Sequence, residues 1–101
     1  MHRKIDGVIV EWDISKNNSN ITKHKLSFET AALVFADGNR IEFYDSLHSE
    51  SEDRYRVIGI VNDVIVVIYT ERKKALRIIS ARYATKAERK IYYGKNSTQN
   101  N

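Results

Sequence analysis

Apolar residues recur along the chain with two kinds of spacing, and each kind predicts a type of secondary structure. Between residues 28 and 35, apolar side chains fall at Phe28, Ala31, Ala32 and Phe35, which is the spacing of one buried helix face. Runs of β-branched and aromatic residues predict strands at 8–12, 41–44, 54–61, 64–70 and 76–81. The run VIVVIY, residues 64–69, predicts a central strand covered on both faces.

Polar residues mark the ends of these elements. Asp13 and Ser27 are good N-cap residues for helices at 14–24 and 28–35. Thr85 and Glu88 have the spacing of a capping box, which predicts a last helix to about residue 93. The NNSN stretch at 17–20 is a poor helix former, so the first helix rests mainly on its cap. The predicted fold is α+β, an antiparallel sheet meander in the order β-α-α-β-β-β-β-α.

Length and composition set the frame for these elements. The chain has 101 residues, of which 42% are hydrophobic, so residues 1–93 suffice for a single domain. The polar residues 94–101 predict a disordered tail. The absence of cysteine excludes disulfides, thiolate metal sites and a cysteine nucleophile. No apolar run reaches the length of a signal-peptide core or a membrane span, so we expect a cytoplasmic protein.

The charge balance is mildly basic, with 17 Lys and Arg against 13 Asp and Glu. Such a domain suits nucleic acid, and it suits a partner with an acidic surface equally well. The sequence contains no P-loop, no dinucleotide-binding fingerprint and no HExxH motif. The three histidines, His2, His24 and His48, are scattered and do not indicate a metal site. We therefore expect neither a cofactor nor a metal ion.

A Lys-His-Lys triplet at residues 23–25 is the first candidate for chemistry. Histidine can transfer protons near neutral pH, and flanking lysines would add positive potential. The same triplet is also what an ordinary solvated helix end looks like, because basic residues stabilise the negative end of the helix dipole. The residues alone leave both interpretations open.

Arginines form the second set of candidates. Arg54 and Arg56 lie two residues apart, so they point to one face of a strand and could hold a phosphate together. Ion pairs with the preceding acidic residues are the alternative, and exposed pairs contribute little. Arg77 sits in an apolar strand and needs a partner, and Arg82 follows that strand.

Aromatic residues could stack on bases or could belong to the core. By periodicity we assign Phe28, Phe35 and Tyr69 to the core. Trp12 and Tyr55 stay open.

Three segments together resemble one known family. These are EWDISKNNSNITKHKLSFETAALVF, EDRYRVIG and IVVIYTERKKALRIISARYATKAERKIYY, and they run from about Val10 to Tyr93. Their motifs EWD, KH, SFE.A..VF, R...IG, YTER, RIISAR and ER..Y resemble the BrnT family in order and spacing. BrnT proteins are small toxins of type II toxin–antitoxin systems, and the resemblance implies a RelE-like fold.

The resemblance also implies an activity and partners. It implies a ribonuclease that cleaves RNA without a metal ion and halts translation, with dependence on the ribosome left open. It implies neutralisation by a BrnA-like antitoxin, a ribbon-helix-helix protein, and contact with operator DNA through the toxin–antitoxin complex. Motif by motif, the family's functional positions fall on Lys23, His24, Glu52, Arg54, Arg77 and Arg82. In this scheme the arginines hold the scissile phosphate, while His24 and Glu52 pass protons in an order left open.

The chain departs from the family pattern at two positions. Lys25 stands where the family usually has glycine, and Ile14 stands where it often has proline. A left-handed backbone at position 25 would strain a lysine, which bears on the geometry of the Lys-His pair. The departure supports an alternative, a degenerate toxin that binds the antitoxin and co-regulates the operon without catalysis. Direct binding of DNA is a weaker alternative, because no helix-turn-helix pattern is present.

Overall fold

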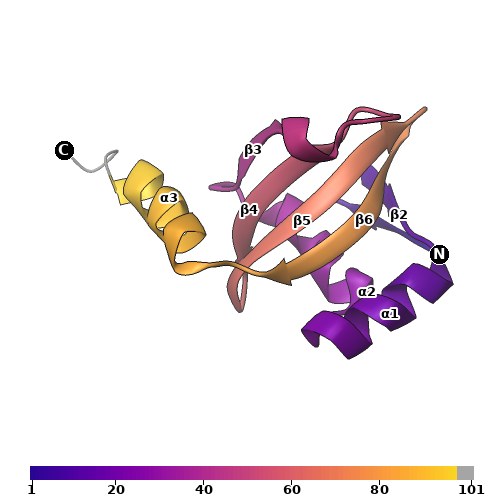
Figure 1. Cartoon of the computed structure of the whole chain (residues 1–101), viewed down its shortest axis with the longest axis horizontal. Helices are drawn as coiled ribbons and strands as arrows, with labels where there is room; N and C mark the ends of the chain where they lie inside the picture. The colour runs from indigo at the N-terminus through magenta and orange to yellow at the C-terminus, as the bar shows by residue number, and fades with distance from the viewer. Residues whose placement is uncertain (98–101) are drawn as a thin grey trace.

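The computed structural model describes residues 1–97, and one six-stranded sheet runs through this part of the chain (Figure 1). From edge to edge, its strands are β1 (His2–Ile5), β2 (Val8–Glu11), β6 (Ala75–Tyr83), β5 (Asp63–Arg72), β4 (Tyr55–Val61) and β3 (Ile41–Tyr44). The described residues also form three α-helices, α1 (Ile14–His24), α2 (Phe28–Ala31) and α3 (Lys86–Ser97). Two short 3-10 turns complete this part, η1 (Ala32–Ala36) after α2 and η2 (Ser46–His48) between β3 and β4.

The strand pairing confirms part of the predicted topology and corrects the rest. The α+β class is confirmed, and β3, β4, β5 and β6 form the predicted antiparallel meander. However, β2 pairs with β6 in parallel, with Val10 opposite Leu76. In addition, β1 forms a hairpin with β2 through Asp6 and Gly7, both at positive φ. The predicted order and the purely antiparallel sheet are therefore wrong, because two strands precede α1 and the sheet is mixed.

Both differences have a physical cause. The sequence of β1 is HRKI, and its first three residues are exposed, so it lacks the alternation that marks a half-buried strand. The parallel pair joins Val10 to Leu76, 66 positions further along the chain, and no local spacing encodes such a contact.

The predicted caps and helices are largely confirmed. The Asp13 carboxylate accepts a hydrogen bond from the Lys16 N–H, and the Ser27 hydroxyl accepts one from the Thr30 N–H. The helix predicted at 28–35 is α-helical to Ala31 and continues as the 3-10 turn η1. Its apolar side still points as a unit into the core.

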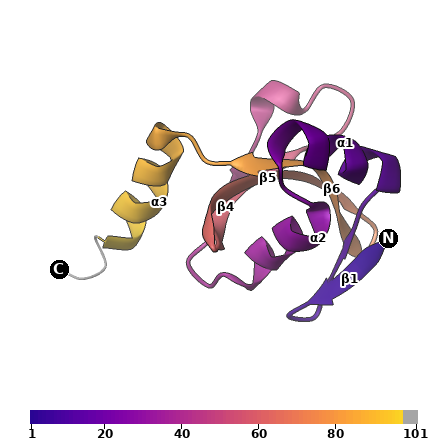
Figure 2. The same cartoon turned by 90° about the horizontal axis from the view of Figure 1, so that it is seen from below.

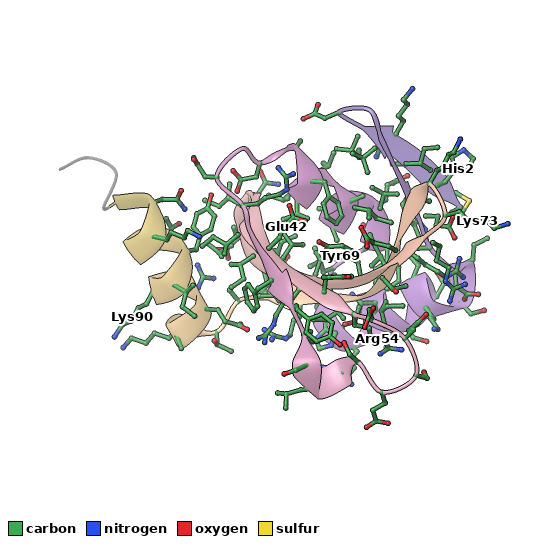
Figure 3. All side chains as sticks on the ribbon, turned by 90° about the horizontal axis from the view of Figure 1, so that it is seen from above. His2, Glu42, Arg54, Tyr69, Lys73 and Lys90 are labelled. Carbon is green, nitrogen blue, oxygen red and sulfur yellow. The ribbon has the colours of Figure 1, made fainter. Side chains whose placement is uncertain are left out.

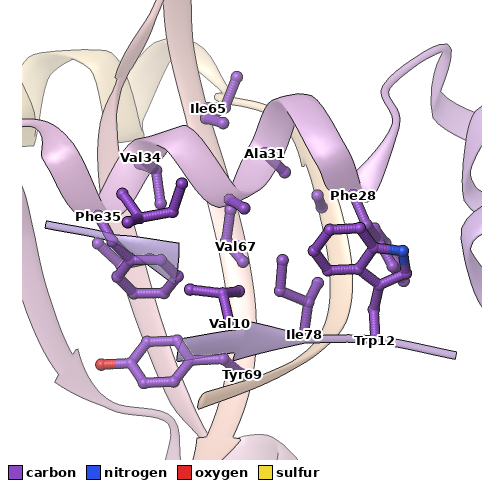
Figure 4. Close-up of a cluster of buried hydrophobic side chains, with 14 of the residues drawn as sticks. Val10, Trp12, Phe28, Ala31, Val34, Phe35, Ile65, Val67, Tyr69 and Ile78 are labelled. Atoms are coloured by element: carbon purple, nitrogen blue, oxygen red, sulfur yellow. The ribbon is translucent and has the colours of Figure 1, made fainter. Parts of the chain in front are cut away.

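The core lies between these turns and one face of the sheet (Figure 4). Phe28, Phe35 and Tyr69 expose at most 5% of their surface there, which confirms them as core residues. Trp12, for which the sequence left two readings, is buried beside them. Gly59 of β4 allows this close packing, because a Cβ there would lie 2.6 Å from Cγ2 of the buried Val34.

The opposite face of the sheet is called the arginine face here. Strand register places Arg56 opposite Ile68, Arg82 opposite Val66 and Arg77 opposite Thr70. By alternation along β4 and β5, the residues that define this face are Arg54, Arg56, Arg72, Arg77 and Arg82. Helix α1 and turn η2 lie on this side of the sheet, and α2 lies on the other (Figure 2).

The central strand β5 is covered on both faces, as its apolar run predicts. Residues 64–67 are all fully buried. Ile65 and Val67 belong to the core under α2 and η1. Val64 and Val66 pack on the arginine face against Ile58 and against Tyr92 of α3.

Asn20 ties α1 to the edge of the sheet. Strand β2 pairs only with residues 75–77 of β6, so the second half of β6 has no strand on the side away from β5. There the Asn20 amide oxygen accepts a hydrogen bond from the Ala81 N–H at 3.2 Å, and its nitrogen donates to the Ala81 carbonyl at 2.8 Å. The same nitrogen donates to the Leu26 carbonyl at 2.8 Å. The buried amide therefore replaces the peptide group of a missing strand.

Glu88 ties α3 to the arginine face. The predicted capping box is confirmed, since the Thr85 N–H donates to Glu88 and the Glu88 N–H donates to Thr85 Oγ1. The Glu88 carboxylate also accepts two hydrogen bonds from Arg82, at 2.7 and 2.9 Å, and one from Arg56 at 3.4 Å. The bonds from Arg82 hold the pKa of the Glu88 carboxyl at about 2, below its ordinary 4.5, although burial opposes the shift.

The last helix is longer than predicted. It continues to Ser97, so the expected boundary at residue 93 falls inside α3, and residues 94–97 do not belong to a disordered tail. Asn96 explains part of the extension, because its side chain donates to the Asn39 carbonyl across the molecule. Residues 98–101 of the predicted tail lie outside the described residues.

Replacing Asn20 by Ala is expected to destabilise the fold by roughly 3 kcal/mol or more. The substitution leaves three buried backbone groups without their partner, and each unsatisfied group costs roughly 1 to 3 kcal/mol. Asn18→Ala is the matched control, since Asn18 is exposed on the same helix. Urea denaturation of both variants measures the difference, and equal midpoints would contradict this role of Asn20.

The Glu88 contacts are expected to make stability depend on pH in the acid range. Because the folded-state pKa is lowered, the stabilisation is complete above about pH 4.5 and is lost as the pH falls towards 2. Glu88→Gln should lose roughly 2 kcal/mol at pH 7 and show a weaker pH dependence between pH 4.5 and 2. Glu29→Gln, at an exposed position of α2, should behave like the wild type. Denaturation curves at several pH values test this, and parallel pH profiles for all three proteins would refute it.

Candidate active-site groove

A groove of about 400 Å³ crosses the arginine face between α1 and the sheet. It is called the α1 groove here. Helix α1 forms one wall, the segment before β4 contributes Arg54, and β6 forms the floor. Its lining residues are Lys16, Ser19, Asn20, Lys23, His24, Arg54, Ile79 and Ser80.

The wall from α1 follows from helical spacing. Lys16, Asn20 and Lys23 lie at i, i+4 and i+7, so they share one side of the helix. Because Asn20 is fixed to Ala81, that side must turn towards β6. Lys23 and His24 then occupy the last turn, at the negative end of the helix dipole.

Lys25 ends this helix in a left-handed conformation, with φ 60° and ψ 31°. Its backbone N–H donates to the Ile21 carbonyl, and its ammonium group donates to the Thr22 carbonyl at 3.2 Å. The left-handed backbone, which strains a residue other than glycine, is therefore present at Lys25. Lys25 is exposed and does not line the α1 groove.

Arg54 enters the groove from the other side (Figure 3). Its backbone N–H donates to the Ser49 hydroxyl at 2.9 Å, and its carbonyl accepts from the Asp45 N–H at 2.9 Å. The guanidinium lies 3.6 Å from Glu52, and its Nε has no hydrogen-bond partner among residues 1–97. Two hydrogen bonds thus fix the backbone of Arg54, whereas its guanidinium has only a long contact with Glu52.

Three of the six predicted site residues, Lys23, His24 and Arg54, share the α1 groove. Glu52 lies 3.6 Å from both Arg54 and Arg72, where it acts as their common counter-ion. The predicted site is therefore brought together in part, and Glu52 is close to Arg54 but does not line the groove.

Arg77 and Arg82 flank the floor of the groove on β6. Five positions apart, they would point to opposite faces of a regular strand. The register with β5 shifts between Ile68 and Tyr69, which leaves Ile79 as the extra residue of a bulge. This bulge puts both arginines on the arginine face, on either side of Ser80. No sequence pattern predicts it.

Both flanking arginines are engaged by carboxylates. Arg77 donates to Glu11 of β2 at 2.7 Å, in a separate pocket beside Trp12. Arg82 is held by Glu88, and these hydrogen bonds raise the pKa of the Arg82 guanidinium above its ordinary value. Within the described residues, Lys23 forms no ion pair, so its charge is available inside the groove.

Sequence reasoning missed several contributors to this region. The sequence predicts Asn20 only as part of a weak helix-forming stretch, and it predicts no role for Lys16 or Ser80. The i, i+4, i+7 spacing of Lys16, Asn20 and Lys23 could have indicated a common polar side of α1. The sequence also predicts no functional role for Asp45 and His48. In the structure, Nδ1 of His48 lies 2.7 Å from Oδ2 of Asp45, next to Arg54.

Residues 1–97 contain neither a cluster suited to a metal ion nor a membrane-spanning helix. No cluster of three or more His, Cys, Asp or Glu side chains there could bind a metal ion. None of the helices in this range is long and apolar enough to cross a membrane.

Comparison with known proteins places these features in a family. A family model described as the ribonuclease toxin BrnT of a type II toxin–antitoxin system matches residues 12–88. The crystal structure of the Brucella abortus ribonuclease toxin BrnT is similar to this fold with a TM-score of 0.60. The two sequences are 28% identical, and the match covers 76% of this chain and 96% of that one. No curated protein matches the chain. The family match includes all residues of the α1 groove, and the chain belongs to the BrnT family of ribonuclease toxins of type II toxin–antitoxin systems.

Proposed function

We propose that this protein is a toxin that cleaves RNA in the α1 groove without a metal ion and thereby inhibits translation. The observation that carries the proposal is the meeting of Lys23, His24 and Arg54 in one groove on a basic sheet face. A phosphate ligand and a proton-transfer group thus lie together, as cleavage of a phosphodiester requires. The family to which the chain belongs supports the choice of RNA as substrate.

In this proposal one arginine binds the phosphate directly, and two others act through their charge. Arg54 is 3.6 Å from Glu52, which is longer than a charge-assisted hydrogen bond of about 2.8 Å, so a phosphate can replace this carboxylate. Arg77 and Arg82 have partners at 2.7 Å and act mainly through the positive potential of the face. Arg54 and Lys23 therefore hold the scissile phosphate and stabilise the charge that builds on it.

Cleavage proceeds by attack of the ribose 2′-hydroxyl on the adjacent phosphorus. The bond from phosphorus to the 5′-oxygen breaks, and the products are a 2′,3′-cyclic phosphate and a 5′-hydroxyl. One group removes the proton of the 2′-hydroxyl, and another protonates the leaving oxygen. His24 is one of these groups, and the sequence nominates Glu52 as the other. Each role contributes roughly two to four orders of magnitude in rate.

The proposed cellular setting follows from the family. A BrnA-like ribbon-helix-helix antitoxin binds the toxin and neutralises it in the cytoplasm. The complex of the two proteins contacts operator DNA through the antitoxin and represses its own operon.

Purified wild-type protein is expected to cleave RNA in the presence of EDTA. His24→Ala and Arg54→Ala should each reduce the rate at least about 100-fold, because they remove a proton-transfer group and the phosphate ligand. Lys23→Ala and Arg77→Ala should reduce it less. Lys90→Ala is the matched control, because Lys90 is exposed on α3 at the far end of the molecule (Figure 3). Gel analysis of labelled RNA measures the rates, and equal degradation by all variants would indicate a contaminating nuclease.

One observation favours the second candidate function, a non-catalytic toxin homologue that binds the antitoxin and co-regulates the operon. Lys25 adopts a left-handed conformation at the end of the groove wall, where the resemblance to the family implies glycine.

Growth after induction of this gene alone separates the two functions. We expect the wild type to arrest growth and His24→Ala to leave it unaffected, because arrest requires cleavage. Immunoblots must show equal amounts of both proteins. Normal growth with the wild type at that level would favour the non-catalytic function.

A further inference from the structure

The turn η2 holds a histidine and a carboxylate that the proposed mechanism does not use. Nδ1 of His48 lies 2.7 Å from Oδ2 of Asp45, so the ring donates a hydrogen bond to the carboxylate. Asp45 is 1% exposed, whereas the His48 side chain is 58% exposed. A buried carboxylate thus orients a ring that faces solvent.

The carboxylate depends on this contact. Its other oxygen, Oδ1, has no hydrogen-bond partner within residues 1–97. Burial of a carboxylate is costly unless a donor or a positive charge compensates it. His48 is the donor that the structure provides for the Asp45 side chain, so the two residues form a pair rather than a chance contact.

This pair is attached directly to Arg54. The Asp45 N–H donates to the Arg54 carbonyl, and the Ser49 hydroxyl donates to the Asp45 carbonyl at 2.7 Å while it accepts from the Arg54 N–H. Figure 3 shows turn η2 beside the labelled Arg54. The position of His48 is therefore fixed relative to the residue proposed to hold the phosphate.

The sheet places this pair across from α1. Helix α1 flanks β6, and η2 follows β3 beside β4, with β5 between β4 and β6. Strands β4 and β6 are thus about 10 Å apart. Both α1 and η2 rise on the arginine face (Figure 2). Arg54 therefore lines the groove that contains His24 and is hydrogen-bonded through its backbone to the turn that carries His48.

We propose that His48, oriented by Asp45, is the second proton-transfer group of the RNA-cleaving site, in place of Glu52. This inference rests on the proposed function. Asp45 fixes the ring with its proton on Nδ1, which leaves the lone pair of Nε2 free to accept a proton. Asp45 also balances the positive charge that the ring then carries.

The proton and bond changes are as follows. Nε2 of His48 takes the proton of the 2′-hydroxyl while the 2′-oxygen forms a bond to phosphorus. The bond from phosphorus to the 5′-oxygen breaks, and that oxygen takes a proton from protonated His24 on the α1 wall. The products are the cyclic phosphate and the 5′-hydroxyl, and later proton exchange with water restores both histidines.

Glu52 suits this role less well. Its two carboxylate oxygens face Arg54 and Arg72, each at 3.6 Å, which makes it a counter-ion on the arginine face. Both of its oxygens are therefore already engaged by positively charged side chains. His48 has an unused ring nitrogen and a partner that keeps it oriented.

The kinetic test uses the full-length protein and a short RNA with one cleavage site. His48→Ala should lower kcat at least about 100-fold and leave KM within about threefold, because the histidine acts in the transition state. Added imidazole should raise the kcat of His48→Ala at least about tenfold. Leu47→Ala is the matched control, since Leu47 is exposed in the same turn and its removal should leave kcat unchanged. Glu52→Gln should lower kcat less than His48→Ala does.

A second measurement tests the pair without reference to activity. In ¹⁵N-detected NMR of the imidazole rings, neutral His48 should carry its proton on Nδ1. Asp45→Asn should reduce the fraction of His48 that carries its proton on Nδ1, and it should lower kcat to a similar extent. If Asp45 only stabilised the turn, the two changes would not go together.

The outcomes separate the two proposals. A wild type that cleaves no RNA overturns the proposed function and the role of His48 with it. An active wild type with full activity in His48→Ala, or with His48 protonated on Nε2, overturns the role of His48 alone.

Discussion

The candidate site depends on one buried amide. Asn20 satisfies both backbone groups of Ala81, on the open edge of β6 beyond its pairing with β2, and the carbonyl of Leu26. Three hydrogen bonds from one side chain thereby fix the rotation and the distance of α1 relative to the sheet. Lys23 and His24 follow in the next turn, so their positions opposite Arg54 are set by the same contact. A less specific apolar contact could hold the helix against the sheet, but it would leave the helix free to rotate.

A second constraint acts on the charges of the arginine face. The bulge at Ile79 brings Arg77 and Arg82 to the side of the sheet that carries Arg54 and Arg56. Their mutual repulsion is offset by Glu11, Glu52 and Glu88, which lie against the five arginines of this face. Such a face is stable without a ligand and still attracts polyanions, since Lys23 adds positive charge in the groove. The loosest of the pairs, Arg54 with Glu52, lies where a phosphate would be exchanged most easily.

The features that the sequence predicts correctly are those with local causes. The caps at Asp13, Ser27 and Thr85, the buried side of residues 28–35 and the central strand all follow from spacings within a few residues. The strand β1, the parallel pair of β2 with β6, the bulge and the contact of Asn20 with Ala81 join distant segments, so no local pattern contains them. The same holds for the candidate site: motif resemblance nominates Lys23, His24 and Arg54, which line one groove, but the pairing of Asp45 with His48 depends on how η2 packs beside β4. His48 looked isolated because its partner is recognisable only once Asp45 is known to be buried.

The lysine at position 25 shows how a departure from a family pattern can be absorbed. A non-glycine residue in the left-handed region costs about 1 kcal/mol relative to glycine. Here the backbone N–H of Lys25 still closes the helix on Ile21, and the ammonium group donates to a carbonyl of the last turn. The strain is thus confined to an exposed residue outside the α1 groove, while Lys23 and His24 keep regular helical positions in its wall. The departure therefore reduces the stability of the helix end more than it changes the geometry of the groove.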